Sequence, residues 1–393
     1  MNPSDLRSRL DAIKDRDSTP SVEVKGTGGD QALPLAEKGL TENGWNRIAG
    51  MVYEKTSYCD NPLHGIISDF LLPEEADASR FVFYDCETTG LSGGAGNMVF
   101  LIGFGIPEGN KLRTVQIMLT DFPGEPAFLE ALDRYISPDK IYVSYNGRSF
   151  DTNILKSRHA MNGMRMEFGF QLDLLYPARR LWKNIIGSCS LGDIEKNILL
   201  KNRALDVPGF MVPDFYFEFI KSGIWSSIER VISHHLDDIQ SLAQLLSVFE
   251  KIYENPLSFR KVDRAGLARL LMDRHPDDAV NVLCAGFDEG SLRSAVELGL
   301  HYKRRGSYSA ACLVWRRMWE AGQNIFAGVE LAKHYEHREK KIDKALFITR
   351  DVLSLERIRI RAILPELEKR RARLEGKLEK SFTSSDIKDQ DLL

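Results

Sequence analysis

Residues 81–90 read FVFYDCETTG, an apolar run that ends in two acidic residues and a Thr-Thr-Gly turn. The Phe, Val and Tyr residues of the run predict a buried β-strand. Because residues two apart on a strand face the same side, Asp85 and Glu87 are expected to present their carboxylates together. Two such charges repel unless a cation lies between them, and paired carboxylates are ligands that Mg²⁺ or Mn²⁺ selects. The alternative is an acidic pair on a solvated surface, and the apolar run before the pair favours the metal site.

Three more β-rich runs follow, separated by Gly-rich or Pro-containing turns, over residues 98–104, 112–119 and 141–145. Apolar residues at helical spacing from Phe128 to Ile136 predict a helix between the third and fourth strands. Further helices are predicted over residues 151–159, 192–199, 215–220 and about 225–253. Three strands, a helix and a fourth strand predict a mixed α/β sheet.

A second acidic position follows the fourth predicted strand in the segment YNGRSFD, residues 145–151. The Asn-Gly pair predicts a turn at the end of the strand, and Asp151 is expected to begin the next helix. Asp151 is then either part of an acidic site or an ordinary acidic residue in the first turn of a helix, where the helix dipole favours it.

The third acidic segment, HHLDD at residues 234–238, lies inside the long predicted helix. The helical neighbours of Asp237 are polar, whereas Asp238 shares its face with Val231 and Leu242 and is therefore expected to point inward. A carboxylate on such a face needs a partner, which a metal ion would supply. His234 lies one turn earlier on the same side, either beside this site or as a core histidine with its own hydrogen bonds.

The composition describes a folded, slightly acidic protein. Lys and Arg number 53 and Asp and Glu 56, so the net charge of −3 excludes a protein that is basic throughout but not a local basic groove. The longest apolar stretch, residues 98–106, is far shorter than the roughly 20 residues that span a bilayer, so no membrane segment is expected. Five cysteines without a CxxC pair and an N-terminus without an apolar signal region favour a cytoplasmic protein with neither a disulfide framework nor a zinc site.

Four segments differ in composition. Residues 1–43 are polar with several Gly and Pro residues, which predicts a disordered leader. Residues 44–256 hold the strands and acidic segments, and residues 45–72 are expected to pack on the sheet. Residues 257–355 carry no strand signal, which predicts an all-helical domain. Residues 356–393 predict a solvated charged helix and a frayed tail, with a basic nucleic-acid contact through Lys369, Arg370, Arg371 and Arg373 as the alternative.

An internal repeat lies in the helical segment. ELGLHY at residues 297–302 recurs as ELAKHY at residues 330–335, an offset of 33 (330 minus 297). This offset is close to the repeat length of about 34 residues in tetratricopeptide repeats, and a degenerate copy is expected over residues 264–287. The alternative is a chance similarity between two ordinary helical hairpins.

The acidic residues Asp85, Glu87, Asp151 and Asp238, in this order and in the contexts DCETTG, YNGRSFD and HHLDD, resemble the DEDD 3′–5′ exonuclease superfamily with its ribonuclease-H-like fold. The chain is most similar to the bacterial YprB-like branch, that of mitomycin repair factor B, in which tetratricopeptide-like repeats follow the nuclease domain. This similarity extends over about residues 45–350. Further blocks that resemble the branch are Gln116, residues 173–180 (DLLYPARR), 190–195 (SLGDIE) and 207–209, Ser241 and Leu242.

The resemblance implies hydrolysis of phosphodiester bonds with two divalent cations, Mg²⁺ or Mn²⁺, held by the four carboxylates. It implies His234 as the general base, since histidine titrates near neutrality. The histidine subclass places this residue five before the last Asp, where this chain has Ser233, so His235 stays an alternative. The residues expected to contact nucleic acid are Thr88, Thr89, Gly90, Asn146, Arg148, Arg179 and Arg180, with Arg158 and Lys183 as further candidates.

The expected partners are DNA, with RNA possible, and a DNA-repair helicase bound through the helical repeats. A structure-specific endonuclease and an RNA exonuclease are alternatives on the same fold, since a fold does not decide function. A non-catalytic scaffold that binds nucleic acid is a third alternative, which the complete set of four carboxylates disfavours.

Overall fold

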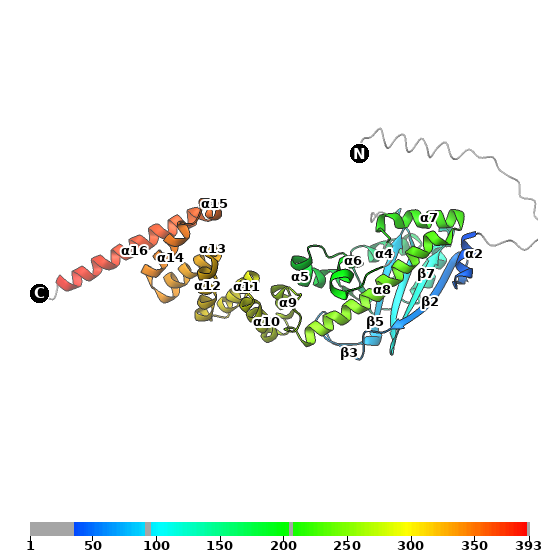
Figure 1. The fold of residues 1–393 in the computed structure, drawn as a ribbon, viewed down its shortest axis with the longest axis horizontal. Helices are drawn as coiled ribbons and strands as arrows, with labels where there is room; N and C mark the ends of the chain where they lie inside the picture. The colour runs from blue at the N-terminus through cyan, green and yellow to red at the C-terminus, as the bar shows by residue number, and fades with distance from the viewer. Residues whose placement is uncertain (1–34, 91–95, 204–206, 391–393) are drawn as a thin grey trace, which may run out of the picture.

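A seven-stranded mixed sheet forms the core of the domain at one end of the molecule (Figure 1). This computed structural model describes residues 35–90, 96–203 and 207–390. The strand order is β1-β2-β7-β6-β5-β8-β9. The strands are β1 (Asn46–Ala49), β2 (Val52–Asp60), β5 (Phe81–Thr88), β6 (Val99–Glu108), β7 (Lys111–Leu119), β8 (Ile141–Ser144) and β9 (Phe170–Asp173), and a separate pair joins β3 (Ile66–Ile67) to β4 (Ala76–Asp77). Strand β5 is antiparallel to β6 and parallel to β8, so β5 and β8 end at the same edge of the sheet.

The sheet is larger than the four predicted strands, which correspond to β5, β6, β7 and β8. The segment 45–72, expected only to pack on the sheet, supplies β1 and β2, and β2 pairs with β7 along its whole length. Its sequence VYEKTSYCD contains no apolar run because most of the strand is only partly buried, so its pairing comes from a distant part of the chain. Strand β9 has four residues, too few for a periodic signal.

The predicted leader is also too long. Residues 35–42 form helix α2 (Leu35–Glu42), in which Ala36 and Leu40 are buried against the sheet domain. The remainder of that prediction, residues 1–34, lies outside the described residues. Helix α2 is short, and its stability comes from tertiary packing rather than from its own sequence.

Helices cover both faces of the sheet. They are α3 (Glu125–Asp133), α4 (Asp151–Met161), α5 (Leu175–Ile186), α6 (Leu191–Ile194), α7 (Val212–Ser222) and α8 (Trp225–Glu254), with short 3₁₀ turns η1 (Ala78–Arg80), η2 (Phe122–Gly124) and η4 (Gly209–Met211) and the π-helix η3 (Glu195–Leu199). Helices α3 and α4 share one core with Val82 and Tyr84, and α8 shares the other with Phe81 and Phe83.

Glycines in β6 allow α8 to approach the sheet closely. A Cβ atom on Gly103 would overlap Ile239 and His235 of α8, and one on Gly105 would overlap Ile239. These two positions therefore set the distance between α8 and the centre of the sheet.

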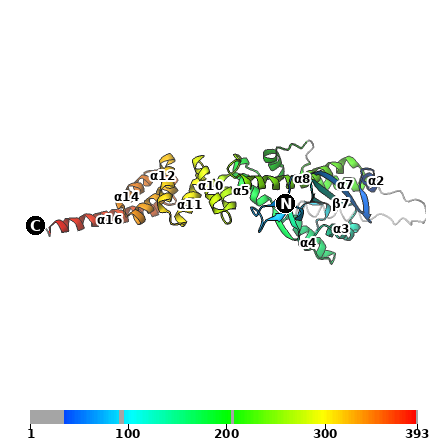
Figure 2. The same cartoon turned by 90° about the horizontal axis from the view of Figure 1, so that it is seen from below.

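A helical domain extends from the sheet domain to the other end of the molecule (Figures 1 and 2). Its helices are α9 (Arg264–Leu271), α10 (Pro276–Asp288), α11 (Leu292–Arg304), α12 (Tyr308–Gly322), α13 (Ile325–His334), the π-helix η5 (Tyr335–Glu339), α14 (Ile342–Leu353), α15 (Arg357–Ile360) and α16 (Leu364–Gln390). In the described part of the chain, none of the helices has the length and apolar character needed to cross a membrane.

The repeated hexapeptides fall on equivalent helices. ELGLHY lies on α11 and ELAKHY on α13 and the start of η5, each the first member of a helix pair. Trp315 of α12 occupies the space that a Cβ of Gly299 would need, so the small residue allows the pair to pack closely. The segment 264–287, where a degenerate copy was expected, forms α9 and most of α10. The fold class is therefore a ribonuclease-H-like sheet domain followed by a helical domain, while the tetratricopeptide assignment stays a prediction.

The charged helix α16 is anchored to the helical domain by a buried carboxylate. Glu336, 1% exposed, lies in the π-helix η5 and accepts hydrogen bonds from Arg370 and Lys377 at 2.8 Å and from Arg373. Arg370 and Arg373, expected on a solvated face or on nucleic acid, instead hold this helix in place. Burial would raise the pKa of Glu336, but the hydrogen bonds from Arg373 and Lys377 lower that pKa to about 2.

We expect Glu336→Gln to lower the free energy of unfolding by about 2 kcal/mol at pH 7, because three cations then lose their shared partner. In the unfolded chain a glutamate titrates at about pH 4.3. The stabilisation by Glu336 is therefore complete above that pH and is lost as the pH falls toward about 2. Urea unfolding at several pH values measures this, with Glu339→Gln in the same π-helix as control. Equal stabilities of Glu336→Gln and the wild type at pH 7 would contradict the anchor.

Candidate active site

The two carboxylates of β5 lie on the face of the sheet that α8 covers. Side chains alternate along β5, with Phe81 and Phe83 packed on the α8 side and Val82 and Tyr84 on the opposite side. Asp85 and Glu87 continue the first series and thus point toward α8, which carries His234 and Asp238. Ligand atoms of Glu87, His234 and Asp238 all lie within 4.8 Å of one another.

Asp151 reaches the same place from the neighbouring strand. It is the first residue of α4 and is buried, after a turn in which Asn146 adopts a left-handed conformation (φ 67°). A Cβ atom on Gly147 would overlap the carboxylate of Asp151 and Ser144, so this glycine gives the carboxylate its space. Asp173 at the end of β9 fixes the turn, since its Oδ1 accepts the backbone N–H of Asn146 at 2.8 Å.

A cavity of about 210 Å³ lies beside these residues. Its walls include Asp85, Glu87 and Asp151, and Tyr145, Phe150 and Val212 line its apolar sides. A small cavity with carboxylates on one side and apolar walls on the other places charged groups where water is limited, which strengthens every electrostatic interaction inside.

The carboxylates lack sufficient positive charge. Burial, and then the charges of Asp238, Asp151 and Glu87, raise the pKa of Asp85 well above its usual range. Burial also raises the pKa of Glu87, and repulsion by Asp238 and Asp151 adds to this. The pKa of Asp151 is raised to about 7 by burial and by Asp173. Oxygen ligands with this excess of negative charge are suited to hard divalent cations, so the residues present fit the expected metal ions.

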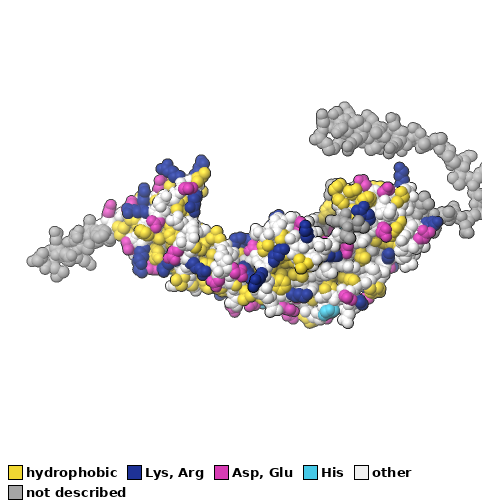
Figure 3. Space-filling view, in the orientation of Figure 1, with side chains coloured by type: hydrophobic (Ala, Val, Ile, Leu, Met, Phe, Trp, Pro, Cys, Tyr) yellow, Lys and Arg dark blue, Asp and Glu magenta, His cyan; other side chains and the backbone are white. Residues whose placement is uncertain are grey.

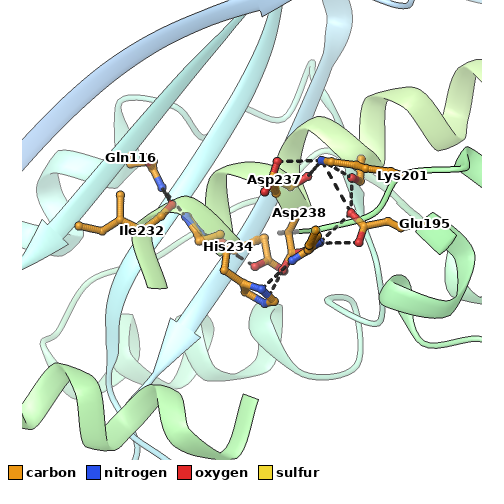
Figure 4. Close-up of polar contacts among 11 residues, drawn as sticks. Gln116, Glu195, Lys201, Ile232, His234, Asp237 and Asp238 are labelled. Atoms are coloured by element: carbon orange, nitrogen blue, oxygen red, sulfur yellow. Dashed lines mark hydrogen bonds and ion pairs between the residues drawn. The ribbon is translucent and has the colours of Figure 1, made fainter. Parts of the chain in front are cut away.

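Arg203 supplies the nearest positive charge to this cluster. Its guanidinium contacts Asp238 and lies 2.6 Å from Nδ1 of His234. Glu195 of the π-helix η3 holds it through two hydrogen bonds of 2.6 and 2.7 Å, and Ser241 of α8 donates to Glu195. Figure 4 shows Glu195 and Lys201 next to Asp237 and Asp238 of α8, with Lys201 2.8 Å from Asp237. Burial raises the pKa of Asp238, and electrostatic interactions with His234 and with the Arg203 guanidinium oppose this rise.

The two adjacent histidines have different environments. His235 is 0% exposed, its Nδ1 accepts from Gln116 Nε2 at 2.9 Å, and its Nε2 donates to the backbone oxygen of Asp85 at 3.0 Å. Burial lowers the pKa of His235 to about 4, so it is neutral at pH 7. His234 instead faces Asp238, with 3.4 Å between Nε2 and Oδ2. His235 therefore joins α8 to the sheet, and His234 is the better candidate for a proton acceptor.

The threonine hydroxyls of the Thr-Thr-Gly segment at the end of β5 form hydrogen bonds with the backbone. The Thr88 hydroxyl donates to the Gly90 carbonyl at 2.8 Å, and the Thr89 hydroxyl accepts the backbone N–H of Met98 at 3.0 Å. Both hydroxyls thus have partners within the strand end, and Thr88 also lines the cavity beside the carboxylates. Their contact with a nucleotide stays a prediction.

The other residues that were predicted to contact nucleic acid divide into two groups. Asn146, Arg148, Arg179 and Arg180 are exposed and stay candidates for nucleic-acid contact. The prediction for Arg158 is wrong, because its guanidinium forms a largely buried ion pair with Glu125, the first residue of α3. Lys183 donates to the carbonyl of Gly187 at the end of its own helix. Spacing along α4 and α5 does not reveal these internal partners.

Glu195 and Arg203 are functional candidates that the sequence alone did not predict. Glu195 ends the block SLGDIE, which resembles the YprB-like branch, and this was its one signal. Arg203 lies in an irregular segment next to residues 204–206, which are outside the described residues. Its approach to α8 depends on the fold of η3, and no local pattern predicts it.

Comparisons with known proteins identify related chains. Residues 82–249 match the RNase H superfamily. A Bacillus subtilis protein described as uncharacterized protein YprB is 32% identical over 304 residues, which make up 73% of this chain and 72% of YprB.

Two solved structures of exonuclease I are also similar. One, which was described as suggesting how processivity is achieved, has 14% identity and a TM-score of 0.29 over 55% of this chain and 45% of its own. The other, a zinc-bound complex of the Escherichia coli enzyme with single-stranded DNA, has the same values over 54% and 44%. This chain thus spans less than half of the exonuclease I chains that it matches.

The superfamily match and the carboxylate cluster together support a nuclease. The identity to YprB is above 30% over nearly three quarters of both chains. The chain therefore belongs to the YprB family, with an RNase H superfamily domain at residues 82–249.

Proposed function

We propose that the protein is a metal-dependent 3′–5′ exonuclease that hydrolyses DNA in repair. The observation that carries the proposal is the proximity of four carboxylates from three separate elements. Asp85, Glu87 and Asp151 line one cavity, and Glu87 lies close to Asp238 and His234. The 3′–5′ polarity and the use of DNA are supported by the resemblance to the DEDD superfamily.

The four carboxylates would hold two divalent cations, Mg²⁺ or Mn²⁺. When bound, the ions would lower the pKa of the attacking water and stabilise charge on the leaving 3′ oxygen. His234, whose Nε2 lies 3.4 Å from Oδ2 of Asp238, would accept the proton of that water. The guanidinium of Arg203 would stabilise negative charge that develops on the phosphate, and Glu195 positions it for this role.

The helical domain would recruit a DNA-repair helicase. Stacked helix pairs present extended surfaces of the kind that bind proteins. We keep this partner, and a cytoplasmic location, as part of the proposal.

A DNA strand labelled at either end tests the proposal. With Mn²⁺ we expect mononucleotides to be released from the 3′ end, so that a 5′ label stays on progressively shorter strands. An RNA strand in parallel measures the preference for DNA. Cleavage of a circular strand would favour an endonuclease, and failure to hydrolyse any nucleic acid with either metal would leave the non-catalytic scaffold.

A further inference from the structure

A groove of about 450 Å³ lies where the sheet domain meets the helical domain. Residues of the sheet domain, among them Arg148, Tyr176 and Arg180, form one wall, and Arg269 and Arg274 of the helical domain line the other. A second hollow of about 450 Å³ continues it and shares Arg148, Phe170 and Gln171. In Figure 1 helix α5 lies beside α9, and Figure 3 shows Lys and Arg side chains gathered on the visible surface over this junction.

Positive charge dominates the groove of a protein that is acidic as a whole. Its lining contains four arginines against two acidic residues, Asp173 and Asp273. Asp173 is 5% exposed and its Oδ1 is occupied by backbone N–H groups, so it contributes little to the surface. Such a local cationic groove is what a polyanion requires.

Three of the four arginines, Arg180, Arg269 and Arg274, differ in how firmly the protein holds them. Arg274 donates to the carbonyls of Asp69 and Leu72 and so fixes the wall of the groove, and Arg269 forms an exposed pair with Glu297. Arg180 is exposed and forms no ion pair within the described residues. A Cβ atom on Gly266 of α9 would overlap the backbone oxygen of Arg180, so the two domains touch at this residue.

Two aromatic side chains stand beside these cations. Phe170 is 43% exposed and Tyr176 50%, unusual values for rings of this size. The Tyr176 hydroxyl lies 3.1 Å from that of Ser149, so the ring is fixed against the turn that leads to Asp151. Exposed rings between cations stack on unpaired bases, whereas paired bases in a duplex are already stacked.

One short turn separates the groove from the carboxylate cavity. Tyr145, Asn146 and Phe150 of this turn line the cavity, and Arg148 lines the groove. A polynucleotide whose end lies among the carboxylates therefore passes directly over the turn into the groove.

We propose that this groove binds the single-stranded part of the substrate behind the nucleotide being removed, with Arg180 and Arg269 on its phosphates and Phe170 and Tyr176 on its bases. The helical domain is then part of the substrate site through Arg269. The proposal rests on the proposed nuclease function for its direction, but binding itself is measurable without hydrolysis.

The test uses the full chain with Arg180→Glu, Arg269→Glu and Tyr176→Ala, and a fluorescent strand of about 20 nucleotides, DNA in one arm and RNA in the other. In EDTA, where nothing is hydrolysed, each variant should bind about tenfold more weakly, and each arginine variant should lower the salt slope by about 0.7 per lost phosphate contact. The control is Arg304→Glu, the same charge change at an exposed position in the last turn of α11. It should bind like the wild type.

Hydrolysis distinguishes this proposal from the previous one. With Mn²⁺ the variants should raise KM for the long strand, whereas Arg304→Glu should leave it unchanged. Absence of hydrolysis in the wild type, with binding lost in the variants, would overturn the nuclease alone. Wild-type affinity in Arg180→Glu and Arg269→Glu would overturn the groove, as would tighter binding to a duplex than to a single strand.

Discussion

Replacing Asp85 with Asn is expected to lower the rate of phosphodiester hydrolysis by about a thousandfold or more while the protein stays folded. Loss of a metal ligand removes several kcal/mol of transition-state stabilisation, and each 1.4 kcal/mol or so corresponds to about a factor of ten. The amide retains the shape of the carboxylate but removes a negative charge that Asp238, Asp151 and Glu87 repel. We therefore expect the melting temperature in EDTA to be unchanged or higher.

Two measurements check this variant. One is the rate of release of labelled mononucleotides with Mn²⁺, and the other is the rise in melting temperature on adding Mn²⁺, which a bound ion causes by stabilising the folded state. The wild type should show both, and Asp85→Asn neither. Asp60→Asn, an exposed carboxylate at the end of β2, is the matched control and should behave like the wild type. Full activity of Asp85→Asn would overturn the assignment of the site.

Replacing His234 with Ala is expected to slow hydrolysis by about a hundred- to ten-thousandfold, the range typical for loss of a general base. The melting temperature should change less than on removal of a fully buried ring, because the imidazole is partly exposed beside Asp238. Substrate affinity, measured by anisotropy in EDTA, should be retained. This combination of a lower kcat with intact binding is the sign of a group that acts in the chemical step.

The neighbouring substitution His235→Ala should lower the stability of the fold rather than slow the chemical step directly. It removes a fully buried ring and one of the two hydrogen-bond partners of Gln116 Nε2, which should lower the free energy of unfolding by about 2–4 kcal/mol. Urea unfolding of both variants separates the two roles. If His234→Ala retained full activity and His235→Ala lost it with an unchanged stability, the two assignments would have to be exchanged.

The elements with strong local patterns were predictable from the sequence. The apolar run before Asp85 predicted β5, and two-residue periodicity placed Asp85 and Glu87 on one face. On α8 the apolar neighbours of Asp238 indicated an inward position, and in the structure Asp237 instead pairs with Lys201. Periodicity is sufficient here because each element buries one face.

The remainder depended on contacts between distant segments. Strand β2 is held by pairing with β7 rather than by an apolar run of its own. The position of Arg203 depends on Glu195, which is itself placed by the π-helix η3 and by Ser241 of α8. Arg158 appeared available because its partner Glu125 lies 33 residues earlier in the chain. No local pattern encodes such pairs.

The junction between the two domains is packed rather than hinged. The ring of Tyr253 lies 5.1 Å from that of His275, Trp182 Nε1 donates to the carbonyl of Lys261 at 2.9 Å, and a single hydrophobic core continues from the sheet into the helical domain. The two walls of the groove are thus held at a fixed separation before any strand arrives. A strand would enter a preorganised site, so the entropic cost of binding would fall on the flexible polynucleotide and not on a closing movement of the protein. Association would then be governed by encounter and charge, and its rate would fall with salt concentration.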